Sequence, residues 1–229
     1  MFFQFHETVS RKMATNIDDF RNATVNIAVV GQSGSGKSTW VNMFRDITDK
    51  NDPLYAETGG RSTECTTELS CFEFKDNKNL KLWDVPGAGS AKFPVKTYKK
   101  VTKMKMYDAF VFLTRSRFME TDVEIAKLIE KTKKPCYFAR THMDVDMQNQ
   151  IGKLNQFQPV VKQAKLKTFA DDLRTECKNA LKGIKTLANI FLVTSRKDED
   201  MQGWIPDNEK LKDAILDNLS EIQKTVLCK

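Results

Sequence analysis

Short apolar segments alternate with amphipathic segments along most of the chain from Val25 onward. The apolar segments have strand length, and we place strands at residues 26–30, 68–74, 80–84, 109–114, 136–141 and 190–194. Helical spacing of apolar residues predicts helices at residues 37–46, 95–107, 123–131 and 208–225, and a long one within 160–182. Such an alternation is typical of βαβ units around a mostly parallel, buried sheet.

The second predicted strand alternates polar and apolar residues and is followed by a polar turn at residues 76–79. We therefore expect it to form a hairpin with the third strand. The predicted fold is α/β, with a mostly parallel six-stranded sheet, one antiparallel edge strand, and helices on both faces. Residues 1–24 are weakly patterned, and we interpret them as an N-terminal helical leader to a domain at residues 25–229.

Composition limits the possible classes of protein. Hydrophobic residues make up 40% of the 229 residues and charged residues 29%, which is enough for a folded core. We expect no membrane-spanning helix and no secretory signal. The odd number of cysteines, 5, predicts reduced thiols and a cytoplasmic location. A net charge of +7 suits polyanionic ligands, but aromatic and basic residues do not interleave, so nucleic acid is not an expected partner.

The clearest chemical motif lies between the first predicted strand and the first predicted helix. Its sequence matches G-x-x-x-x-G-K-[ST], the phosphate-binding loop, in residues Gly31, Gln32, Ser33, Gly34, Ser35, Gly36, Lys37 and Ser38. Backbone N–H groups of such a loop, and the start of the helix that continues through Thr39, bind phosphate oxygens. We expect Lys37 to neutralise the β- and γ-phosphates and Ser38 to bind Mg²⁺.

A second motif, Asp84-Val85-Pro86-Gly87, follows the third predicted strand. Ligands of parallel sheets collect outside the carboxyl ends of the strands, so Asp84 is expected to face the phosphate loop and to bind Mg²⁺ through a water. Gly87 lacks a Cβ, and its N–H can therefore approach a γ-phosphate.

Residues 57–67 form a polar segment between these two motifs. A threonine hydroxyl in this segment would bind Mg²⁺ when a triphosphate is present and withdraw after hydrolysis. We favour Thr66 for this role, and Thr63 is the alternative. Lys37, Thr66 and Gly87 are then the residues expected to act on the transferred phosphate.

A third motif, Thr141-His142-Met143-Asp144, follows the fifth predicted strand, where guanine-binding proteins carry [NT]-K-x-D. Asp144 can accept both N1–H and N2–H of guanine, whereas adenine offers no such pair; a hydrogen bond to a charged group contributes about 1.5–3 kcal/mol. His142 replaces the usual lysine, and its imidazole can stack on the purine instead. We expect Ser195 and Arg196 to bring backbone N–H groups to the guanine 6-oxygen.

These motifs are joined by further segments that many phosphate-loop proteins lack. The segments are Trp83-Asp84-Val85-Pro86-Gly87, Phe93-Pro94-Val95-Lys96-Thr97-Tyr98, Tyr107-Asp108-Ala109-Phe110, Arg117-Phe118 and Tyr137-Phe138-Ala139-Arg140-Thr141. With them the chain resembles the immunity-related GTPases, the interferon-inducible GTPase family, over residues 27–219. The resemblance implies a Ras-like P-loop NTPase domain that binds GTP or GDP, hydrolyses GTP slowly, and self-associates on intracellular membranes, often in defence against pathogens.

The chain differs from the family pattern at identifiable positions. Family members carry glutamate where Gln32 stands and lysine where His142 stands. They also wrap the G domain in a helical domain built from both termini, and we expect the C-terminal half of that domain to be absent here. Glu64 matches the acidic residue that family members use at their dimer contact, and a Met-Gly start for lipidation is absent.

The residue after Gly87 bears on the rate of hydrolysis. Ras-like proteins place a water-orienting glutamine there, and this chain has Ala88. We therefore expect intrinsic turnover on the order of 10⁻⁴ s⁻¹, and a faster rate when a homodimer forms across the nucleotide face. One alternative is a nucleotide-dependent binding module that has lost most turnover. Another is an ATP-using small-molecule kinase, against which Asp144 and the turn at residues 84–87 argue.

Overall fold

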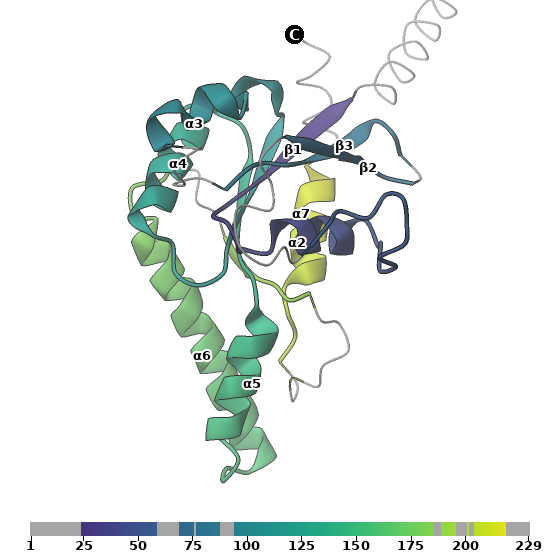
Figure 1. Ribbon diagram of the computed structural model, residues 1–229. Coiled ribbons are helices and arrows are strands. Elements are labelled where there is room, and N and C mark those ends of the chain that lie inside the picture. The colour runs from purple at the N-terminus through teal and green to yellow at the C-terminus, as the bar shows by residue number, and fades with distance from the viewer. Residues whose placement is uncertain are drawn as a thin grey trace, which may run out of the picture.

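The computed structural model describes residues 24–58, 69–75, 77–87, 94–185, 189–195, 201 and 204–218 (Figure 1). In chain order the elements are β1 (Val25–Val30), α2 (Lys37–Phe44), β2 (Ser70–Glu73), β3 (Leu80–Asp84), α3 (Val95–Val101), the short 3-10 helix η1 (Met104–Met106), β4 (Ala109–Thr114), α4 (Glu120–Glu130), β5 (Cys136–Arg140), α5 (Met143–Lys153), α6 (Pro159–Ala180), β6 (Ile190–Leu192) and α7 (Asn208–Asp217).

The six strands form one sheet in the order β2-β3-β1-β4-β5-β6. β1 pairs in parallel with β3 and β4, and the parallel pairing continues through β5 to β6. β2 pairs antiparallel with β3 and lies at the edge. The predicted six-stranded α/β fold with one antiparallel edge strand is therefore confirmed.

β4 shows how the helices cover both faces of the sheet, because each of its residues is buried. Successive side chains of a strand point to opposite faces. Phe110 and Phe112 pack in the cluster that includes residues of α3, α4 and α6. Val111 and Leu113 pack in a second cluster with residues of α2 and α7. The sheet is the middle of three layers, and α5 packs along α6 below it (Figure 1).

The predicted helix at residues 95–107 is wrong as a single element. α3 ends at Val101, and η1 follows after a turn. The Thr102 hydroxyl donates to the carbonyl oxygen of Tyr98 at 2.6 Å, and Lys103 adopts a left-handed backbone with φ of 51°. The left-handed backbone of Lys103 ends the helix without a glycine or proline.

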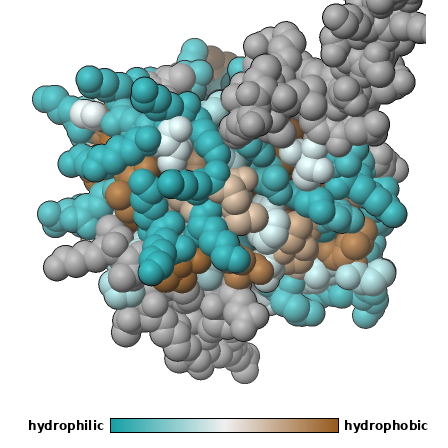
Figure 2. Space-filling model, turned by 90° about the horizontal axis from the view of Figure 1, so that it is seen from above, coloured by the Kyte–Doolittle hydropathy of each residue, from teal (hydrophilic) through white to brown (hydrophobic). Residues whose placement is uncertain are grey.

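Lysines of this region are exposed, as expected for a solvated face: Lys99, Lys100, Lys103 and Lys105. Figure 2 views this end of the molecule from above and shows hydrophilic side chains over most of it, with smaller apolar patches. None of the helices described has the length and apolar composition needed to cross a membrane. The predicted leader at residues 1–24 falls outside the described residues apart from Thr24.

Candidate functional site

The phosphate loop connects β1 to α2, and because α2 begins at Lys37 the start of the helix opens onto the loop. Gly31 has φ of +148°, and a Cβ built there would lie 2.1 Å from the carbonyl oxygen of Leu113 in β4. Only glycine fits this approach. The loop is thereby held at the carboxyl ends of the parallel strands, where ligands of such sheets bind.

The Lys37 side chain is buried against the phosphate loop. Its Nζ donates to the carbonyl oxygens of Gly31 at 3.2 Å and Gln32 at 3.0 Å. The ammonium group is therefore held beside the loop backbone, in the place where a phosphate bound to that loop would meet a compact positive charge.

Ser38 and Asp84 lie in contact although 46 residues separate them. The Ser38 hydroxyl donates to Oδ2 of Asp84 at 2.6 Å. The pairing of β1 with β3 sets Asp84 beside Val29, and Asp84 is 2% exposed. Hydroxyl and carboxylate oxygens are ligands that Mg²⁺ prefers, so the pair fits the predicted metal site. Thr66, predicted to join them, lies outside the described residues.

The turn after β3 packs directly on the phosphate loop. A Cβ built on Gly87 would lie 2.5 Å from the backbone nitrogen of Ser33 and 3.1 Å from the carbonyl carbon of Gln32. The Tyr98 hydroxyl donates to the carbonyl oxygen of Pro86 at 2.9 Å and anchors the turn to α3. Gly87 is thus held beside the loop predicted to bind the phosphates.

The segment predicted to recognise the base, residues 141–144 (the base-recognition segment), follows β5 and contacts the phosphate loop. The Thr141 hydroxyl donates to the carbonyl oxygen of Ser35 at 2.8 Å. The backbone N–H of Met143 donates to the carbonyl oxygen of Val193 at 3.3 Å. Asp144 lies in the first turn of α5 and is 4% exposed. The structure therefore brings the predicted phosphate and base segments together.

His142 packs on the phosphate loop in a left-handed conformation with φ of 59°. A Cβ built on Gly36 would lie 3.3 Å from Cε1 of His142. Nδ1 of His142 lies 2.8 Å from the Thr141 hydroxyl oxygen. Burial, and then the nearby Arg115 guanidinium, lower the pKa of His142, while Asp144 acts in the opposite direction. The imidazole is therefore neutral at pH 7.

An open pocket of about 310 Å³, its mouth included, lies beside this segment. Its lining residues are Gly36, Thr39, Trp40, Met43, Thr141, His142, Val193, Thr194 and Ser195. Ser195 thus lies at this pocket, and its predicted contact with guanine stays a prediction; Arg196 lies outside the described residues. Trp40 and Met43 of α2 were not predicted to belong to the site, since their spacing in an amphipathic helix indicates only core packing.

Asp122 also contacts the phosphate loop, which the sequence did not predict. It lies in the first turn of α4, is 1% exposed, and accepts hydrogen bonds from Nε2 of Gln32 at 3.0 Å and the backbone N–H of Met119 at 2.9 Å. Burial raises its pKa, although these two hydrogen bonds oppose the rise. Nothing in the local sequence indicates that this helix-start carboxylate reaches the phosphate loop.

The fold and the three facing segments define the G-domain class of phosphate-loop proteins. Among solved structures, the chain is similar to a probable GTP-binding protein engB, with a TM-score of 0.52, 16% identity, and coverage of 86% of this chain and 100% of that one. It is similar to the bacterial selenocysteine-specific elongation factor EF-Sec with a TM-score of 0.52, 18% identity, and coverage of 87% of this chain and 29% of the other. At these identities the likeness shows the fold alone.

The chain belongs to the interferon-inducible GTPase (IIGP) family, whose model matches residues 5–229. It is 35% identical over 167 residues to Interferon-inducible GTPase 1 of Mus musculus, covering 72% of this chain and 38% of the relative. It is 31% identical over 185 residues to Interferon-gamma-inducible GTPase 10 of Mus musculus, covering 78% and 41%. The resemblance inferred from the motifs is confirmed, and the matches span about two fifths of each relative.

Proposed function

We propose that this chain binds GTP and GDP together with Mg²⁺ and hydrolyses GTP to GDP and phosphate at a low intrinsic rate. The observation that carries the proposal is the 2.6 Å hydrogen bond between Ser38 and Asp84, which joins two hard oxygens at the end of the phosphate loop. Family membership and the G-domain fold support GTP binding and hydrolysis.

On the phosphate side, the chain provides fixed positive charge and hydrogen-bond donors. The start of α2 and the Lys37 ammonium both lie at the phosphate loop. Donors that need no rearrangement stabilise the charge that spreads over the transferred phosphoryl group. Ser38 and Asp84 would hold Mg²⁺, which neutralises charge on the β- and γ-phosphates when bound.

On the base side, Asp144 provides the selectivity. Its carboxylate would accept N1–H and N2–H of guanine, and its buried position makes a mismatched base costly, since the charge would then lack those donors. The Thr141 hydrogen bond to Ser35 fixes the distance between this segment and the phosphate loop. A nucleotide that fits one end of the site is thereby aligned with the other.

Orientation of the attacking water is the part of the reaction for which the described residues provide least. The side-chain amide of Gln32 donates to Asp122, so it is turned toward α4. Without a water-orienting group, turnover on the order of 10⁻⁴ s⁻¹ is expected, and a group supplied by a partner adds about 10³–10⁵. We propose that a second copy of the chain, bound across the nucleotide face, supplies that group.

The test begins with titrations of the purified chain with GTP, GDP and ATP, each with Mg²⁺. We expect guanine nucleotides to bind and ATP to fail, and equal binding of ATP would contradict the proposal. GTP hydrolysis is then measured over a hundredfold dilution series, with Lys37→Ala as the control for contaminating activity. Specific activity should rise with protein concentration, and a flat series would contradict the homodimer.

A second candidate function is a nucleotide-dependent assembly module with little or no hydrolysis. The engagement of Gln32 by Asp122 favours it, because the amide is occupied by a buried carboxylate. Single-turnover measurements separate the two functions. A first-order decay of bound GTP that is faster than that of Lys37→Ala supports the hydrolase, and identical decays support the module.

We further propose that the protein acts in the cytoplasm, attached peripherally to intracellular membranes, in cell-autonomous defence. Membership of the interferon-inducible GTPase family supports this role. Fractionation of cells that express the protein tests it. Recovery in the membrane fraction, with release by alkaline carbonate, is the expected result, whereas recovery in the soluble fraction in both nucleotide states would contradict membrane attachment.

A further inference from the structure

β6 lies at the edge of the sheet and pairs with β5 on one side. Val193 directs its backbone toward that side, since its N–H donates to the carbonyl oxygen of Arg140 at 2.8 Å. Alternate residues of a strand point their backbone groups to opposite sides, so Leu192 and Thr194 present theirs to the open edge. Both residues are buried, at 0% and 1% exposure, and buried backbone groups need partners.

Two consecutive residues at the start of α7 supply those partners. Asp207 pairs with Leu192: its backbone N–H donates to the Leu192 carbonyl oxygen at 2.7 Å, and its Oδ2 accepts the Leu192 N–H at 3.0 Å. Asn208 pairs with Thr194: its Oδ1 accepts the Thr194 N–H at 3.0 Å, and its Nδ2 donates to the Thr194 carbonyl oxygen at 2.8 Å. For these two residues, Asp207 and Asn208 replace a further strand.

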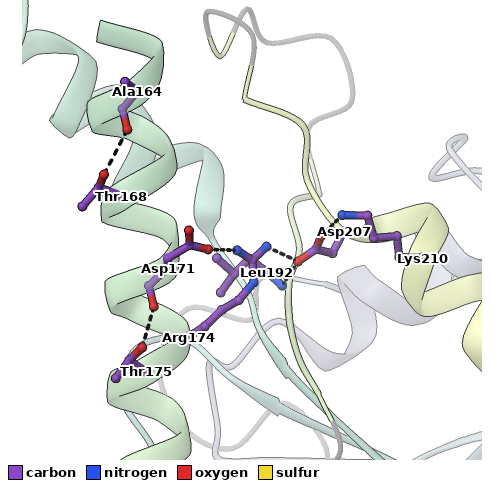
Figure 3. Close-up of polar contacts among 8 residues, drawn as sticks. All are labelled: Ala164, Thr168, Asp171, Arg174, Thr175, Leu192, Asp207 and Lys210. Carbon is purple, nitrogen blue, oxygen red and sulfur yellow. Dashed lines mark hydrogen bonds and ion pairs between the residues drawn. The ribbon is translucent and has the colours of Figure 1, made fainter. Parts of the chain in front are cut away.

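Asp207 is itself held by two cations, as Figure 3 shows. Arg174 of α6 donates from Nη2 to Oδ2 at 2.6 Å, and Lys210 of α7 donates from Nζ to Oδ1 at 2.9 Å. Burial alone would raise the pKa of Asp207, but the hydrogen bonds from Arg174, Lys210 and the Leu192 N–H outweigh it and lower the pKa. The charged carboxylate therefore anchors the edge of the sheet to both helices.

Asn208 contacts residues that line the pocket beside the base-recognition segment. Thr194, which it holds, lines the pocket between Val193 and Ser195. Nδ2 of Asn208 also lies 3.2 Å from the sulfur of Met43, another residue of the lining. A single carboxamide thus contacts two walls of the pocket, one from the segment after β6 and one from α2.

We propose that Asn208 is a positioning residue for recognition of the 6-oxo group of guanine. It touches no part of the nucleotide itself. Both backbone groups of Thr194 are bonded to Asn208, so the next donor along the segment, the Ser195 N–H, is the one that meets the 6-oxygen. The inference rests on the proposed binding of GTP and GDP.

The test compares the full chain and Asn208→Ala in their affinity for GDP and for 6-thio-GDP, each with Mg²⁺. The analogue keeps the N1–H and N2–H donors that Asp144 would accept but carries sulfur, a poorer acceptor, in place of the 6-oxygen. We expect Asn208→Ala to weaken GDP binding by about threefold to tenfold and to weaken 6-thio-GDP binding less, so that the preference for GDP falls.

The control is Asn218→Ala, which removes the asparagine that directly follows α7 and whose Nδ2 donates to the carbonyl oxygen of Ala214 at 2.8 Å. Its affinities should equal those of the unaltered chain. Equal weakening of both ligands by Asn208→Ala, or no weakening, would overturn the inference and leave GTP binding intact. If the unaltered chain binds neither ligand, the proposed function and the inference both fail.

Thermal unfolding without nucleotide shows whether Asn208→Ala is folded at the assay temperature. If it is not, Asn208→Asp replaces it, because the carboxylate still accepts the Thr194 N–H and the start of α7 tolerates negative charge. That variant loses the Nδ2 donor to the Thr194 carbonyl oxygen and to the Met43 sulfur, and sets a carboxylate oxygen against both. An intermediate preference for GDP supports the inference, and an unchanged preference overturns it.

Discussion

The Thr141 hydroxyl donates a 2.8 Å hydrogen bond to the carbonyl oxygen of Ser35, which lies 106 residues earlier in the chain. The same hydroxyl oxygen lies 3.2 Å from the carbonyl oxygen of Thr114. Ser35 belongs to the phosphate loop and Thr141 to the base-recognition segment. One buried hydroxyl therefore couples the two ends of the proposed nucleotide site.

Removing this hydroxyl should weaken nucleotide binding. Thr141→Ala is expected to raise the dissociation constant of GDP about tenfold, which corresponds to about 1.4 kcal/mol and matches the loss of a buried hydrogen bond. Thr141→Ser keeps the hydroxyl and should stay within about twofold of the unaltered chain. Isothermal titration with GDP and Mg²⁺ provides the measurement. If the serine and alanine variants bind equally, the hydroxyl has no such role.

The stability of the fold should depend on the protonation of His142. Burial, and then Arg115, hold the pKa of His142 below its ordinary value of 6.5 in the folded chain, although Asp144 and Asp146 oppose this. Between that lowered pKa and about 6.5 the unfolded chain binds more protons, so acid favours unfolding there. The contribution of His142 is therefore complete above about pH 6.5 and is lost as the pH falls toward the lowered pKa.

The comparison for this prediction is His142→Asn, because asparagine tolerates the left-handed backbone that His142 adopts and does not titrate. Urea unfolding at several values between about pH 5 and pH 7.5 gives the free energy of unfolding of both proteins. We expect the unaltered chain to lose stability relative to the variant on acidification. Parallel profiles across the range would refute the prediction.

Local sequence patterns were enough to predict which elements surround the site and where they lie in the chain. The strand, glycine-rich loop and helix around Lys37 appear in chain order, and the structure has β1, the loop and α2 there. Asp84 and Asp144 each end or follow an apolar strand, so parallel pairing brings them to the same edge of the sheet. Their roles in binding stay predictions.

The parts that the sequence did not predict depend on contacts between distant residues. α5 has only three buried apolar residues, Met143, Met147 and Ile151, within a polar segment, and the residue that precedes it, His142, forms no side-chain cap hydrogen bond. The hydrogen bond between Asn208 and Thr194 has no sequence signature either, because an asparagine at the start of a helix is usual whether or not it contacts a strand. Such contacts follow only from the packing of α7 against β6.

A methyl group on Gly87 should interfere with hydrolysis. Its Cβ would lie 2.5 Å from the backbone nitrogen of Ser33, so the turn or the phosphate loop must move. We expect Gly87→Ala to lower GTP turnover at least tenfold, because the N–H of this residue would no longer reach the γ-phosphate, while GDP affinity changes by less than about threefold. Gly152→Ala, where a Cβ meets nothing within 4 Å, is the matched control and should hydrolyse GTP normally.

The Ser38–Asp84 pair should determine the dependence on Mg²⁺. In the unaltered chain, chelation of Mg²⁺ by EDTA is expected to lower GTP affinity at least tenfold, since the ion, held by Ser38 and Asp84, would neutralise charge on the phosphates. Ser38→Ala and Asp84→Asn each remove a group that would hold the ion, directly or through a water, so GTP affinity in EDTA should stay close to that of the unaltered chain while the gain on adding Mg²⁺ largely disappears. The double variant should lose little more than either single one, because residues that act through one ion are not additive. Independent losses that sum in the double variant would show that Ser38 and Asp84 do not share a metal ion.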